Sequence, residues 1–142
     1  MDEIKALFAN DALAKHLGME LGELSRGRAV ARMTVRDEHL NLFGTAHGGI
    51  IFTLADFAFE AACNSHGTVA VALNVNISYL KAAGPGTLTA TATEISCAGR
   101  IGTYDIPVTD ESGERVASFH GLAYRKRDPL PGLEMPGDAA GD

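Results

Sequence analysis

The apolar stretch from Ile50 to Cys63 constrains the fold of this chain more than any other feature. Nearly every residue in it is Ile, Phe, Leu or Ala, and the pair Gly48 and Gly49 comes directly before it. A helix that is apolar on almost all sides must be covered on almost all sides. The strands expected after the helix can supply that cover if they form one strongly curved antiparallel sheet. The sequence therefore predicts an α+β fold with one long buried helix.

Alternation of apolar and polar residues predicts six strands around this helix. The helix is expected over residues 48–65, and the strands over residues 19–24, 28–35, 69–81, 87–96, 102–109 and 115–125. The turn Asp110-Glu111-Ser112-Gly113 marks a hairpin between the last two strands. Residues 1–17 are expected to form a helical segment broken and capped at Asn10-Asp11. Residues 18–127 are then the main domain, and residues 128–142, rich in Pro, Gly and acidic residues, a mobile tail.

Charge and composition argue against several classes of function. The formal net charge of −6 argues against general nucleic-acid binding. The basic cluster Arg125-Lys126-Arg127 is either a solvated strand end or a contact for the phosphates of a nucleotide-bearing substrate. No run is long enough to span a membrane, and the acidic N-terminus does not resemble a signal peptide, so a cytoplasmic protein is expected. The two cysteines and five scattered histidines lack metal-ligand spacing, so no metal site is expected.

Four polar residues share one stripe of the apolar helix: Thr53, Asp56, Glu60 and Asn64. Burying an unpaired carboxylate is costly, so Asp56 needs an explanation. Either the stripe faces water, or Asp56 lies in a pocket whose chemistry needs a carboxylate.

The residues before the helix favour the pocket. Backbone N–H groups at Gly48 and Gly49 lack partners within the helix and can bind an anion or a developing oxyanion. His47 and Asn41, just upstream, are two further polar groups able to bind a ligand.

Taken together, these residues resemble a known family. The pattern Asn41-x-x-Gly44-x-x-His47-Gly48-Gly49, then Leu54-Ala55-Asp56 and Asn64-x-x-Gly67, is similar to that of the hot-dog-fold acyl-CoA thioesterases of the phenylacetic-acid-degradation type. The resemblance covers about residues 15–127. It implies the hot-dog fold, a curved antiparallel β-sheet wrapped around one central helix. It also implies hydrolysis of a small aromatic or medium-chain acyl-CoA without a cofactor, because coenzyme A is part of the substrate.

Thioester hydrolysis suggests a role for each of these groups. Asp56 is expected to activate water as a general base or to attack the thioester itself, and the first is favoured. The amide of Gly49, with Gly48 beside it, suits the carbonyl oxygen. The resemblance implies that Asn41 helps to bind the thioester or to position water. His47 either bonds the carbonyl or fixes the loop, and the loop role is favoured.

The spacing of these groups implies a second subunit. Asp56 lies about 10 Å along the helix axis from Gly49, too far for both to reach one carbonyl in the same subunit. The family resolves this with a homodimer whose helices run antiparallel, so that each site is shared. Such dimers often pair into tetramers, and the expected partners are therefore acyl-CoA and further copies of this chain.

Two positions depart from the family pattern. Ala72 stands where a Ser or Thr often orients the water, and Asn74, expected on the same strand face, can substitute for it. Glu60 stands where a small residue is common, and it is expected either to line the acyl pocket or to bond across the dimer interface.

The resemblance also points to contacts with the rest of the substrate. Arg100 and Gly102 on a predicted hairpin, and Lys81 after the long strand, are expected to contact the coenzyme arm. Phe52, Phe57 and Phe59 are candidates for the acyl pocket, although Phe57 at least is expected in the core.

Two other functions stay open. A hot-dog hydratase or dehydratase would act on the same thioesters, but such sites need an acid/base group over the Cα–Cβ bond, and no obligate His accompanies Asp56. A non-catalytic acyl-CoA-binding protein would keep the fold without turnover. Thiol release from a panel of acyl-CoA thioesters separates all three.

Overall fold

The computed structural model describes residues 1–135, and residues 136–142 of the expected tail lie outside the described residues. The helices are α1 (Asp2–Ala9), α2 (Ala12–Leu17) and α3 (Gly48–Asn64), with a 3-10 turn η1 (Asp37–His39). The strands are β1 (Glu20–Ser25), β2 (Arg28–Val35), β3 (Thr68–Tyr79), β4 (Gly86–Ala98), β5 (Ile101–Thr109) and β6 (Arg115–Pro129). All the expected helices and strands are present, and β6 ends at Pro129 rather than at residue 125.

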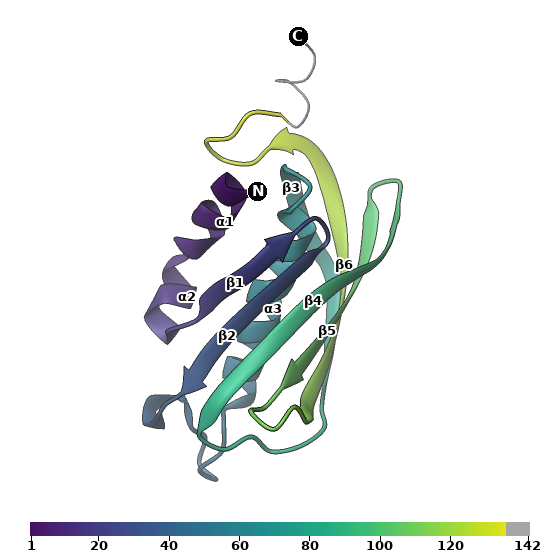
Figure 1. Ribbon diagram of the computed structural model, residues 1–142. Helices are drawn as coiled ribbons and strands as arrows, with labels where there is room; N and C mark the ends of the chain where they lie inside the picture. The colour runs from purple at the N-terminus through teal and green to yellow at the C-terminus, as the bar shows by residue number, and fades with distance from the viewer. Residues whose placement is uncertain (136–142) are drawn as a thin grey trace.

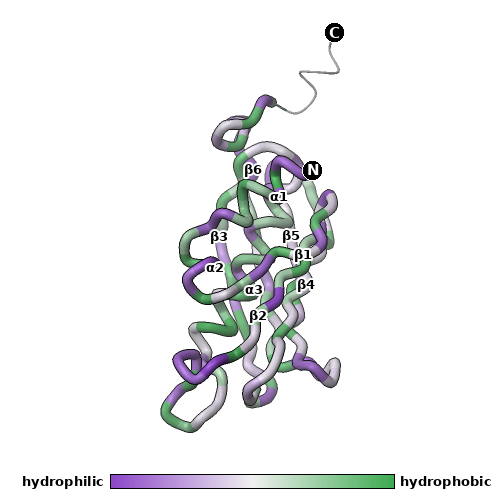
Figure 2. The backbone as a smooth tube through the Cα atoms, turned by 60° about the vertical axis from the view of Figure 1, so that its left-hand side comes forward, coloured by the Kyte–Doolittle hydropathy of each residue, from purple (hydrophilic) through white to green (hydrophobic). Residues whose placement is uncertain are grey.

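The strands form one antiparallel sheet in the order β1-β2-β4-β5-β6-β3, which curves around α3 (Figure 1). The N-terminal helix α1 lies beside β1 and α3, as the two views show (Figures 1 and 2). Asp11 separates α1 from α2 as expected, because its side chain accepts a hydrogen bond from the N–H of Ala14. Among residues 1–135, no helix is long and apolar enough to cross a membrane.

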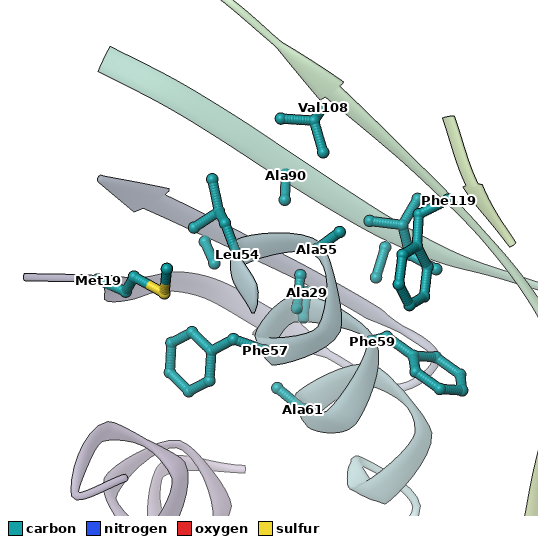
Figure 3. Packing of buried hydrophobic residues seen from close by; sticks show 14 of the residues in the cluster. Met19, Ala29, Leu54, Ala55, Phe57, Phe59, Ala61, Ala90, Val108 and Phe119 are labelled. Atoms are coloured by element: carbon teal, nitrogen blue, oxygen red, sulfur yellow. The ribbon is translucent and has the colours of Figure 1, made fainter. Parts of the chain in front are cut away.

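The core is the contact between α3 and the concave face of the sheet. Leu54 and Ala55 are 0% exposed, and Phe57 is also buried, as the sequence predicted. The strands that face α3 present small side chains such as Ala29 and Ala90, so the helix approaches the sheet closely (Figure 3). The prediction of a buried helix wrapped by an antiparallel sheet is confirmed.

Gly121 of the sheet leaves space for the ring of Phe59 from α3. A Cβ on Gly121 would lie 2.7 Å from ring atoms of Phe59. The same ring packs at 5.5 Å from Tyr104 and 5.8 Å from Phe119, measured between centroids. Phe59, which was expected to line the acyl pocket, is 1% exposed and lies in the core.

Strand β3 forms an open edge of the sheet, because it pairs only with β6. Its apolar side chains include Val71, Leu73 and Tyr79, which are 40%, 55% and 52% exposed. An exposed edge strand presents unpaired N–H and C=O groups that can pair with another chain.

A β-bulge in this edge overturns one expectation. Ala72 pairs with Ala123, and Asn74 pairs with Leu122, so Leu73 is an extra residue in β3. Ala123 and Leu122 are neighbours in β6 and face opposite sides of the sheet. The prediction that Asn74 shares a face with Ala72 is therefore wrong, and Asn74 lies on the outer face of the sheet, away from α3.

Candidate active site

The start of α3 is held by two side chains. His47 is the N-cap, and its Nδ1 accepts a hydrogen bond from the N–H of Gly49 at 3.0 Å. The hydroxyl of Tyr79, at the end of β3, donates to the carbonyl oxygen of Gly48 at 2.9 Å. The N–H of Gly48 has no acceptor among the described residues. The amide that is open at this helix start is therefore that of Gly48, since the amide of Gly49 already binds His47.

A groove of about 430 Å³ lies beside this helix start, and we call it the Tyr79 groove. Asn41, Gly48, Tyr79 and Lys81 are among its lining residues. The Asn41 side chain organises its own loop, because its Oδ1 accepts hydrogen bonds from the N–H groups of Phe43 at 2.9 Å and Thr45 at 3.1 Å. Asn41 thus lies beside the open amide, while its side-chain oxygen Oδ1 is already hydrogen-bonded within the loop.

The two carboxylates of α3 are half-buried near a third one. Burial, followed by the charge of Asp11, raises the pKa of Asp56. Burial, then Asp11 and then Asp56, raises the pKa of Glu60 to about 7. No ion pair or hydrogen bond to either side-chain carboxylate of α3 is found within residues 1–135. Both carboxylates can therefore accept a proton or a hydrogen bond from a further group.

Glu60 lies in a second groove, of about 500 Å³, between the N-terminal helices and the start of β3. We call it the Glu60 groove. Its apolar walls include Leu7, Val69 and Leu130, and Asp11 lies at its edge with Glu60. Two residues of the polar stripe of α3, Glu60 and Asn64, therefore line a groove at the surface.

Of the residues expected to contact the coenzyme arm, Arg100 and Gly102 share the β4–β5 hairpin, whereas Lys81 lies beside the β5–β6 hairpin. Lys81 lines the Tyr79 groove, but its Nζ already binds the carboxylates of Asp110 and Glu114 on the β5–β6 hairpin. Arg100, on the β4–β5 turn, donates to the carbonyl oxygen of Arg125 at 3.3 Å. Gly102 is buried, and a Cβ there would lie 2.7 Å from the Tyr104 ring, so its lack of a side chain serves packing.

Two further features of the structure could not be predicted from the sequence. The sequence around Tyr79 predicts a strand, and nothing in it predicts the contact of Tyr79 with Gly48. A polar network at the far end of α3 was also missed: Glu94 binds His66 Nε2 at 3.1 Å and the Tyr104 hydroxyl at 2.9 Å, with Arg125 at 3.6 Å. Its members come from four segments distant in sequence, so no local motif reveals it. Within residues 1–135, no group of His, Cys, Asp and Glu is arranged to hold a metal ion.

Comparison with known proteins identifies the family and the fold of this chain. The model of the thioesterase superfamily matches residues 43–117, which include the helix start, both α3 carboxylates and most of the sheet. The chain belongs to the thioesterase superfamily. Within the superfamily it is PaaI-like, and its sheet and central helix form the hot-dog fold.

The chain is also similar to individual members of the thioesterase superfamily. It is 42% identical over 121 residues to acyl-coenzyme A thioesterase PaaI of Escherichia coli K12, covering 84% of this chain and 86% of the relative. The solved structure of E. coli PaaI, from the phenylacetic acid degradation operon, superposes with a TM-score of 0.84 at 41% identity, covering 87% and 91% of the two chains. A protein of Streptococcus mutans UA159, solved bound to acetyl CoA, gives a TM-score of 0.72 at 28% identity and covers 76% and 88%.

Proposed function

We propose that this chain is an acyl-CoA thioesterase, in which water adds to the acyl carbon and coenzyme A leaves as the thiol. The observation that carries the proposal is Asp56, a half-buried carboxylate without a partner among residues 1–135, on a helix whose start has an open amide. One group activates or attacks, and the other stabilises the oxyanion. The relatives named above support the choice of an acyl-CoA thioester as the substrate.

The proposed site is shared between two copies of this chain. Gly49 and Asp56 are seven residues apart on α3, which corresponds to about 10 Å along the axis. The open edge of β3 supports a dimer in which two sheets continue into each other. A two-fold axis beside β3 would bring the helix start of one copy towards Asp56 of the other. The positive end of that helix would also favour the ionised form of Asp56, against the effect of burial.

The amide of Gly48 is the proposed donor to the oxyanion. The N–H of Gly49 becomes available only if the His47 ring moves away, because the two are bonded at 3.0 Å. We therefore assign His47 to holding the helix start, and Asn41 to shaping the wall of the Tyr79 groove beside the reacting carbonyl. Arg100 remains the proposed contact for a coenzyme phosphate, whereas Lys81 must first give up its two carboxylate partners.

Asp56 is proposed to act as a general base. Since Asn74 lies on the outer face of the sheet, the attacking water must be held by Asn41 or by backbone groups instead. A single turnover in ¹⁸O-water with enzyme in excess tests this role. Label confined to the product acid supports the general base. Label in the Asp56 peptide shows that the carboxylate attacked the thioester and formed an anhydride, which would refute the assignment.

Thiol release from acetyl-, medium-chain and arylacetyl-CoA tests the activity and its acyl preference. Asp56→Asn should keep the fold and substrate binding while lowering kcat by roughly 10²- to 10⁴-fold. Asp128→Asn, at an exposed carboxylate of β6, is the matched control and should behave as the wild type. Wild-type turnover by Asp56→Asn would show that another group does the chemistry. Hydration of an enoyl-CoA without thiol release would indicate a hydratase instead.

A further inference from the structure

The loop before α3 ends in two apolar side chains that stand in solvent. Leu42 is 93% exposed and Phe43 is 84% exposed, and we call this pair the loop tip. The tip is not loose, because Asn41 holds it from both sides: its Oδ1 accepts from Phe43 N–H, and its own N–H donates to the Thr45 carbonyl at 2.7 Å. Single exposed apolar residues are ordinary, but two adjacent ones on a braced turn form a ready contact surface.

The Glu60 groove offers a matching surface at the other end of β3. Its apolar walls come from α1 and the start of β3, and include Leu7, Phe8 and Val69. Its polar edge is formed by Asp11 and Glu60, neither of which makes an ion pair within residues 1–135. This groove therefore suits an apolar insert from a surface that also brings positive charge.

The dimer that the proposed function requires sets these two surfaces side by side. Leu73, the bulged residue, lies near the middle of β3, and a two-fold axis there pairs the start of one β3 with the end of the other. The loop tip belongs to the Tyr79 end, since Asn41 and Tyr79 line one groove. The Glu60 groove belongs to the Val69 end. The tip of each copy thus falls beside the groove of the other copy.

The charges of the two surfaces are also complementary. The loop tip lies a few residues before the start of α3, where the helix dipole places partial positive charge. The groove carries Asp11 and Glu60, with Asp56 one turn away on the same helix. Opposite charges at the two ends of β3 favour the antiparallel arrangement over a parallel one.

We infer that the loop tip of one copy occupies the Glu60 groove of a second copy. This inference rests on the dimer of the proposed function and deepens it. The tip then covers Glu60 and becomes part of the wall around the acyl group, so Leu42 and Phe43 belong to the site of the other subunit.

The dissociation constant of the dimer, measured by sedimentation equilibrium on the full chain, tests the inference. The double variant Leu42→Ser/Phe43→Ser should raise it by at least about tenfold, because two apolar side chains per copy lose their burial. Ile95→Ser is the matched control: it removes another exposed apolar side chain, 61% exposed, from the β4–β5 hairpin, and should leave the constant unchanged. Circular dichroism should show the wild-type fold for both variants, since neither site is buried in the subunit.

A variant of the groove decides whether the tip and the groove meet. Val69→Asp should weaken the dimer by itself, and adding it to the loop-tip variant should weaken the dimer little further, since both remove the same contact. Additive effects would overturn the inference, as would an unchanged dissociation constant for the loop-tip variant. If Val69→Asp raises KM without affecting the dimer, the groove takes the acyl group and not the tip. None of these outcomes affects the test of the thioesterase activity, which is the loss of thiol release in Asp56→Asn. Failure of the loop-tip inference can therefore be distinguished from failure of the proposed function.

Discussion

Glu60→Gln should stabilise the protein above neutral pH. Burial and the nearby carboxylates of Asp11 and Asp56 raise the pKa of Glu60 from 4.5 to about 7. That difference corresponds to at most ~3.4 kcal/mol, and partial contact of the side chain with water reduces the expected gain to about 1–2 kcal/mol. The folded protein keeps a proton on Glu60 that the unfolded chain releases between pH 4.5 and 7. Stability of the wild type therefore falls as the pH rises through this window, and it stays lower above pH 7.

Thermal unfolding of wild type and variant at pH 4, 6 and 8 measures the effect. At pH 8 the variant should melt about 3–6 °C higher, and the difference should vanish at pH 4, where Glu60 is protonated in both states. Glu20→Gln, at an exposed carboxylate of β1, is the control and should show no such dependence. A Glu60→Gln gain of equal size at pH 4 and 8, or a loss of stability at pH 8, would refute the reasoning.

Three more variants probe the core and the helix start. Phe59→Ala, at a side chain 1% exposed, should lower the free energy of unfolding by about 3–5 kcal/mol in urea titrations, and a loss below about 1.5 kcal/mol would contradict its place in the core. His47→Ala should cost about 1 kcal/mol of stability because Gly49 N–H loses its cap; an unchanged urea midpoint would show that the cap is weak. Tyr79→Phe, which removes the hydrogen bond to the Gly48 carbonyl, should lower kcat several-fold with little change in melting temperature, whereas wild-type kcat would show that Tyr79 does not position the amide.

The fold could be predicted because its main determinants are local. The apolar run of α3 requires cover, and the alternating strands after it supply that cover. The ends of elements were less predictable: β6 continues to Pro129, and Leu130 beyond it is buried. That extension depends on contacts with distant residues, which no local pattern encodes.

The surroundings of the helix start could be predicted from the sequence only in part, because the residues there were expected but their contacts were not. The motif predicted that Asn41, His47 and the two glycines would gather before α3, and they do. It could not show that His47 already occupies the Gly49 amide, because that choice depends on the rotamer of the ring. Nor could it show the face of Asn74, since a single bulged residue reverses every later side chain in the strand.

The fit of Phe59 against Gly121 means that these two positions share one volume. Alanine at position 121 should be poorly tolerated alone, because its Cβ would lie 2.7 Å from the ring. A smaller residue at position 59, as in Phe59→Leu, would return the space that the new methyl group needs. In related sequences that descend from this chain, substitutions at the two positions should therefore occur together. The packing of helix α3 on strand β6 thus links two positions that are far apart in sequence.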